Sequence, residues 1–146
     1  MTVQHDIRLF LADVDGALVT KEKVLTEAAK AAVRELDQAG IAFAITSGRP
    51  PRGMSMLIEP LALRTAIAGF NGGVLVKPDL SVIESHTLEP AAARQTLKLI
   101  LDKGLDVWVY TETEWLIRDK DAPHVARETW TVKFDAKVVA SFTDAH

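Results

Sequence analysis

Ile7–Gly16 reads IRLFLADVDG, a short apolar run that is followed at once by Asp13, Asp15 and Gly16. The run Ile7–Ala12 shows little alternation of apolar and polar residues, which is typical of a strand that is covered on both faces. Asp and Gly are common in turns, so the motif alone also fits a solvated turn after a strand. Its position directly after a strand of the buried type favours a functional pair of carboxylates.

Two more apolar runs of this kind follow, at Ile41–Ile45 and Thr65–Phe70. Helical patterns lie between the three runs. Thr26 is a suitable N-cap and Gly40 a suitable C-terminal glycine for the first helix, and the pair Pro50–Pro51 marks the start of the second. Strands and helices that alternate at this spacing predict an α/β fold with a doubly wound parallel sheet.

Polar residues follow each of the three strands, and in such a sheet the groups just past the carboxyl ends of the strands line the ligand crevice. Taken singly, the second and third clusters fit ordinary turns, and the arginine fits a surface charge as well as an anion ligand. Their coincidence at three strand ends favours one site. Its members are Asp13, Asp15 and Gly16 after the first strand, Ser47, Gly48 and Arg49 after the second (with Thr46 as the alternative hydroxyl), and Asn71 and Gly72 after the third.

Asp13 and Asp15 raise each other's pKa at short range unless a cation lies between them. The pair therefore predicts a divalent metal ion, and Mg²⁺ above all. A phosphate substrate increases the need for a cation, because each like-charge pair at about 4 Å and an effective dielectric constant of about 20 costs ~4 kcal/mol. Ser47 and the backbone N–H groups after Gly48 are candidate donors to phosphate oxygens.

A hairpin over 74–83 ends the first part of the chain, and the pattern changes after about Glu84. The later part predicts an α+β segment, so we place one domain over residues 1–84 and a second over 85–146. Trp108, Trp115 and Trp130 are expected to pack its core, with the lining of its crevice as the alternative. The predicted elements are a helix over 90–103, a hairpin over 106–118, a short helix over about 121–130 and a strand over 137–139.

The composition excludes several classes of protein. The 146 residues hold 17 Lys+Arg against 20 Asp+Glu, a net charge of −3 that argues against a nucleic-acid partner. The absence of cysteine excludes disulfide scaffolds, zinc ribbons and thiol nucleophiles. No stretch approaches the ~18 apolar residues that a membrane span needs, so we expect a cytoplasmic protein without a membrane partner.

The ordered set of motifs resembles the haloacid dehalogenase (HAD) superfamily, and most of all its Cof-type sugar-phosphate phosphatases. The resemblance implies a partial Rossmannoid core followed by a partial α+β cap. Ala17 departs from the family, which usually has Thr there. The matching stretches are LFLADVDGALV, ELDQAGIAFAITSGRP, AGFNGGVLV and LKLILDKGLDVWVYTETEWLIRD.

The resemblance also implies a chemistry. Asp13 attacks the phosphoryl group of a small phosphorylated metabolite and forms an aspartyl phosphate. Asp15 protonates the leaving alcohol and then activates water. The Asp13 carboxylate and the Asp15 backbone carbonyl hold Mg²⁺. Ser47 aligns with the hydroxyl motif of the family, and Arg49 and Asn71 lie where phosphate or substrate contacts are expected.

Members of this family are about twice as long, and their later part supplies a lysine and a Gly-Asp-x-x-x-Asp metal motif. Neither is found after residue 84, so the resemblance implies a chain that stops within the cap, at His146. The strand Ile7–Ala12 is central in the family. Here we expect it to be an open edge, through which the chain forms a homodimer or pairs with a complementing chain.

Three functions are compatible with these residues. The first is a Mg²⁺-dependent HAD-type phosphatase. The second is a catalytically inactive remnant that binds phosphate or a protein partner. The third is a receiver-like signalling domain, which also carries acidic and hydroxyl residues at strand ends but lacks the second segment and the Ser-Gly-Arg-Pro turn, so it ranks last.

Overall fold

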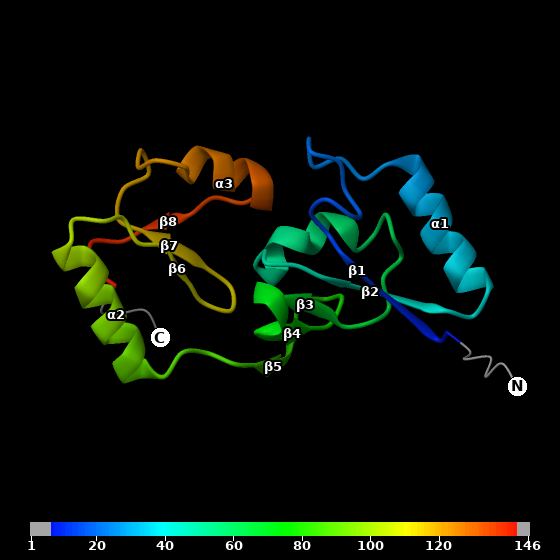
Figure 1. The fold of residues 1–146 in the computed structure, drawn as a ribbon, viewed down its shortest axis with the longest axis horizontal. Helices are drawn as coiled ribbons and strands as arrows, with labels where there is room; N and C mark the ends of the chain where they lie inside the picture. Colours follow the sequence, from blue (N-terminus) through cyan, green and yellow to red (C-terminus); the bar gives the residue numbers. More distant parts are fainter. Residues whose placement is uncertain (1–6, 143–146) are drawn as a thin grey trace, which may run out of the picture.

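A computed structural model of the 146-residue chain describes residues 7–142. Two sheets lie side by side, each with its own helices (Figure 1). The five-stranded sheet is built from the first part of the chain, and the three-stranded sheet from the second part. No helix within residues 7–142 has the length and apolar character needed to cross a membrane.

The five-stranded sheet has the order β1-β2-β3-β4-β5. β1 pairs with β2 and β2 with β3 in parallel, whereas the pairs β3–β4 and β4–β5 are antiparallel. The predicted α/β fold with a parallel sheet is therefore confirmed for the first three strands, and the predicted hairpin follows them. The strands are β1 (Leu9–Asp13), β2 (Ala42–Thr46), β3 (Ile67–Gly69), β4 (Val74–Val76) and β5 (Val82–Ser85).

Helical segments connect the parallel strands. α1 (Glu27–Gln38) begins as predicted, because the Thr26 hydroxyl oxygen accepts a hydrogen bond from the Ala29 N–H at 3.1 Å. Gly40 ends the helix with a φ of +72°. The segment after Pro50 is a 3₁₀ helix, η1 (Pro51–Leu57), rather than an α-helix.

Two features of η1 bear on its local form and on its position beside β3. Gly53 lowers the preference for an α-helix at this point. Pro51 is wedged against β3, since a Cβ atom on Gly69 would lie only 2.6 Å from the Pro51 Cδ. The close approach of the two backbones fixes the start of the helix at the end of β2, next to the predicted site.

The second part of the chain forms a three-stranded sheet in the order β6-β7-β8, with its own hydrophobic cluster around Trp115 and Val132. Trp115 is buried as predicted, but the prediction for Trp130 is wrong, because 45% of its surface is exposed. It lies on α3 beside Lys133, whose ammonium is 4.9 Å from the centre of the indole ring. The elements are α2 (Pro90–Asp102), β6 (Val109–Tyr110), β7 (Trp115–Ile117), α3 (Val125–Val132) and β8 (Lys137–Val138).

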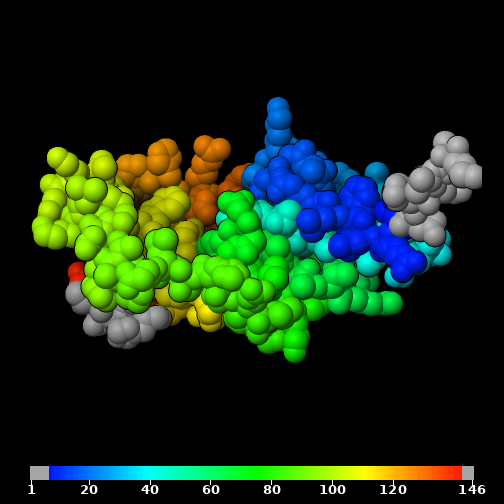
Figure 2. Space-filling view, turned by 60° about the horizontal axis from the view of Figure 1, so that its bottom comes forward, coloured from blue at the N-terminus to red at the C-terminus, as the bar shows by residue number. Residues whose placement is uncertain are grey.

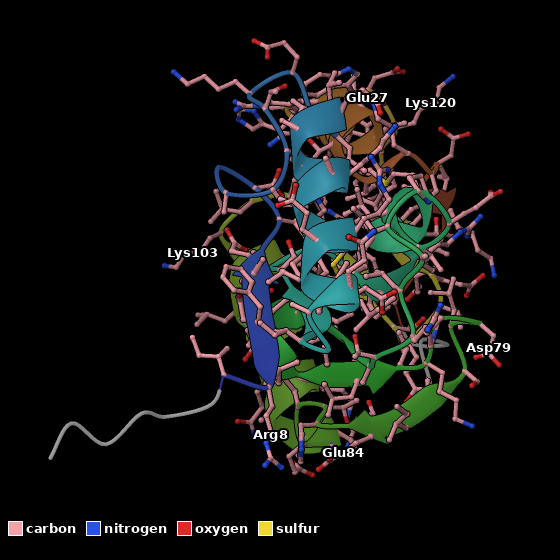
Figure 3. The ribbon with its side chains drawn as sticks, turned by 90° about the vertical axis from the view of Figure 1, so that its right-hand side faces the viewer. Arg8, Glu27, Asp79, Glu84, Lys103 and Lys120 are labelled. Carbon is pink, nitrogen blue, oxygen red and sulfur yellow. The ribbon has the colours of Figure 1, made fainter. Side chains whose placement is uncertain are left out.

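β1 lies at the open edge of its sheet (Figure 3, with Arg8 at the start of the strand). Leu9 is 54% exposed, Phe10 49% and Leu11 58%, and Figure 2 shows this strand, in dark blue, at the surface. The expectation that both faces are covered is therefore wrong for the described residues. The expected open edge is present, because nothing within residues 7–142 pairs with the far side of the strand.

The burial of each isoleucine in this sheet predicts how much its side chain contributes to the free energy of unfolding. Ile45 on β2 is fully buried, whereas Ile83 on β5 is 51% exposed. Ile45→Ala should lower the free energy of unfolding by about 2–5 kcal/mol, because it leaves a cavity in the core. Ile83→Ala should lower it by less than about 1 kcal/mol. Urea unfolding followed by circular dichroism measures both, and equal losses would contradict this description of the core.

Candidate active site

The carboxyl ends of the three parallel strands bring the three predicted clusters to one edge of the sheet. In the register of the sheet, Asp13 lies opposite Thr46, and Thr46 lies opposite Ala68. Ser47 directly follows β2, and its N–H donates to the Ala68 carbonyl at 3.0 Å. Asn71 follows β3 closely. The three clusters thus lie at the same edge of the sheet, as their positions in the sequence suggest.

A bidentate ion pair between Arg49 and Asp15 forms the centre of this edge. The Arg49 Nε and Nη2 atoms donate to the two carboxylate oxygens of Asp15, both at 2.7 Å. Arg49 is 5% exposed, so the alternative of a surface charge is wrong. The hydrogen bonds from Arg49 lower the pKa of Asp15 from its ordinary 3.8 to about 2, which keeps this carboxyl ionised at neutral pH.

Ser47 and Asn71 are joined through the backbone beside this pair. The Asn71 N–H donates to the Ser47 carbonyl at 2.8 Å. The Ser47 side chain is buried, and its oxygen accepts from the Arg49 N–H at 3.2 Å. This hydrogen bond caps the turn after β2, which is the ordinary turn that the sequence also allows at this cluster. The Ser47 hydroxyl accepts this bond and still has its own proton to donate. The Asn71 amide packs over Gly48, with Oδ1 3.5 Å from the place of a Cβ there.

Two of the predicted glycines turn the chain away from the site. Gly16 follows Asp15 with a φ of +87°, and Gly72 follows Asn71 with a φ of +92°. Both values lie in the region where a side chain is strained, so glycine is favoured at each turn. Gly16 and Gly72 are exposed, and a Cβ on either would meet no atom within 4 Å. Backbone conformation therefore explains these glycines without a ligand.

Lys23 is a site residue that the sequence reasoning missed. Its ammonium lies 2.6 Å from the Asp15 Oδ1, so two cations share one carboxylate. The loop that carries it folds back onto the motif through single β-bridges from Val19 to Asp15 and to Leu25. Nothing local distinguishes Lys23 from its neighbour Lys21, so only the path of the loop reveals the contact.

The donor set at this edge fits Mg²⁺ in part. Asp13 is exposed and carries a carboxylate, whereas both carboxylate oxygens of Asp15 are bound by cations. Within residues 7–142 no group of three or more His, Cys, Asp or Glu residues is placed to hold a metal ion. Mg²⁺ commonly takes one or two carboxylates together with waters and substrate phosphates, so Asp13 and a backbone carbonyl suit it as part of a set.

A separate cavity of about 1100 Å³ lies between α2 and the β6 hairpin. Leu97 and Leu101 of α2 line one side, and Val109 and Tyr110 line the other. None of the predicted site residues lines it. Within α2, no residue is buried, which agrees with a helix that stands off from the sheet across this cavity.

Comparison with known proteins identifies the family. The sequence model of the haloacid dehalogenase-like hydrolases matches residues 10–145, and the chain belongs to this family. It is 26% identical over 124 residues to the HMP-PP phosphatase of Cronobacter sakazakii, covering 85% of this chain and 46% of that one. It is 29% identical over 114 residues to a 5-amino-6-(5-phospho-D-ribitylamino)uracil phosphatase of Bacillus subtilis, covering 76% and 46%.

The solved structures agree on the fold. A haloacid dehalogenase-like hydrolase from Bacteroides thetaiotaomicron superposes with a TM-score of 0.84 at 21% identity, over 95% of this chain and 54% of that one. The chain thus spans about half the length of the relatives that it matches. The expected resemblance to the HAD superfamily is confirmed.

The Arg49–Asp15 pair predicts how stability changes with pH. A carboxyl whose pKa is lower in the folded state stabilises the fold above its unfolded value, and this stabilisation is lost as the pH falls through the folded value. Unfolding free energy should therefore fall between pH about 4 and about 2. In Arg49→Met this part of the pH dependence should shrink. Urea unfolding at several pH values measures it, and identical slopes in both proteins would contradict the role of the pair.

Proposed function

We propose that these residues form the nucleophile-bearing half of a magnesium-dependent phosphatase that acts on a small phosphorylated metabolite. The observation that carries the proposal is the meeting of Asp13, the Arg49–Asp15 pair and Ser47 at the carboxyl ends of adjacent parallel strands. Family membership supports it. The two relatives named above are phosphatases of phosphorylated small molecules, which favours a substrate of that class.

In the proposed reaction, a carboxylate oxygen of Asp13 attacks phosphorus and the bond from phosphorus to the ester oxygen breaks. Asp15 first leaves its ion pairs with Arg49 and Lys23 and takes up a proton from solvent. It then gives this proton to the departing oxygen, which leaves as an alcohol. Asp15 then takes a proton from water as the water oxygen attacks the aspartyl phosphate. This second step releases phosphate and restores the Asp13 carboxylate.

Other residues would bind the phosphoryl group and the metal ion. Ser47 donates its hydroxyl proton to a phosphate oxygen, and Asn71 and Arg49 border the space where the substrate lies. The Asp13 carboxylate and the Asp15 carbonyl would hold Mg²⁺, which offsets the negative charge of nucleophile and phosphate. Because the described residues offer few ligands, further ligands come from water, substrate or polypeptide outside residues 7–142.

A second candidate is a phosphate-binding unit that has no turnover until another polypeptide completes it. Two observations favour it: the incomplete set of metal ligands and the open edge at β1. An apolar edge strand recruits a further strand. We propose that this edge pairs with polypeptide carrying the rest of the fold or, in its absence, with a second copy of the chain.

The two candidates differ in turnover. With Mg²⁺, the chain should hydrolyse p-nitrophenyl phosphate, and Asp13→Asn should lower the rate by about a hundredfold or more because the nucleophile is lost. Asp37→Asn, at an exposed position on α1, serves as the control and should leave the rate unchanged. Hydrolysis that survives Asp13→Asn would contradict the first candidate. Phosphate binding without hydrolysis would support the second.

The proposed pairing at β1 predicts self-association of the isolated chain. Light scattering at tens of micromolar protein should report a dimer or larger species. This concentration lies above the micromolar dissociation constants that are ordinary for protein interfaces. Leu11→Lys should restore the monomer, because a charge on an edge strand disfavours pairing. Leu99→Lys is the control on α2, where the leucine is equally exposed but not on a strand. If the unsubstituted chain is a monomer at this concentration, the result contradicts this proposal.

A further inference from the structure

The second part of the chain touches the first at η1, the helix that follows the site residues Ser47 and Arg49. α3 packs against η1, and Val132 on α3 is fully buried there. A Cβ on Gly53 of η1 would lie 3.1 Å from the Val132 Cβ and 3.3 Å from its Cγ1. A methyl group at Gly53 would therefore fit only if Val132 moved away by a few tenths of an ångström.

Gly53 is also a partner of the site arginine. The Arg49 Nη1 donates to the Gly53 carbonyl at 3.2 Å, while Nε and Nη2 of the same guanidinium bind Asp15. A guanidinium is planar and rigid, so its three N–H directions move together. A shift of the Gly53 carbonyl therefore changes the angle at which Arg49 meets Asp15.

Neighbouring contacts hold the same interface in place. The Arg52 guanidinium lies 4.7 Å from the centre of the Phe134 ring, which follows α3. After β3, Phe70 packs against Tyr110 of β6 with ring centres 5.5 Å apart. Arg52 directly precedes Gly53, and Phe70 directly precedes Asn71. The second part of the chain thus contacts two of the three segments that carry the site, those that follow β2 and β3.

We infer that Val132 is a positioning residue: its packing on Gly53 sets the orientation of Arg49 against Asp15. The inference deepens the proposed function, because it names how the second segment acts on the site, and it rests on that proposal for its catalytic meaning. The arrangement itself is measurable without turnover. Failure of this inference is therefore distinguishable from failure of the phosphatase proposal.

The test adds a methyl group at the contact. Gly53 does not have a left-handed φ, so Gly53→Ala introduces a steric conflict with Val132 and no backbone strain. The readout is the Nε–H signal of Arg49 in ¹H–¹⁵N spectra, assigned by its loss in Arg49→Lys. We expect this signal to shift and its hydrogen exchange to quicken by about tenfold, because the bond to Asp15 loosens.

A compensating substitution distinguishes positioning from general damage. Val132→Ala removes both γ-methyl groups, so in the Gly53→Ala background it should restore the Arg49 signal and its slow exchange in part. Val125→Ala, at another buried valine of α3, is the matched control and should restore neither.

Two results would overturn the inference. One is an unchanged Arg49 signal in a folded Gly53→Ala protein whose melting temperature has fallen. The other is equal recovery with Val132→Ala and Val125→Ala. Should Gly53→Ala not fold, the single variants decide the matter: Val132→Ala must quicken exchange of the Arg49 Nε–H more than Val125→Ala does, and equal effects count against the inference.

Discussion

The pairing of Arg49 with Asp15 is the constraint on which the rest of the site depends. One buried guanidinium joins the loop after β1 to the end of β2 through two hydrogen bonds of 2.7 Å, and reaches η1 through the Gly53 carbonyl. Removing one partner of such a pair leaves a desolvated charge, which is costly. The pair therefore fixes the motif loop relative to the second strand, while Asp13 itself is placed by the register of β1 on β2.

Much of the fold was predictable because its signals are local. Thr26 caps α1 through its own hydroxyl, and Gly40 ends that helix in a conformation that favours glycine. The clustering of Asp13, Ser47 and Asn71 follows from topology, since parallel strands present their carboxyl ends at one edge. The predicted chemistry of these residues still depends on the resemblance to the family.

The remaining features depend on neighbours that are distant in the sequence. Lys23 reaches Asp15 only because its loop folds back, and Gly53 matters only because Val132 lies against it. Trp130 looks like a core residue by type, yet its helix turns it outward beside Lys133. The apolar β1 predicts a covered strand, yet within residues 7–142 no strand pairs with its outer edge.

The most direct test is a crystal structure of the chain with Mg²⁺ and orthovanadate, a mimic of the phosphoryl group in transfer. The account predicts density for the vanadate within bonding distance of an Asp13 oxygen, with Ser47 donating to it. An empty edge of the sheet at saturating vanadate, or vanadate bound only in the cavity beside α2, would contradict it.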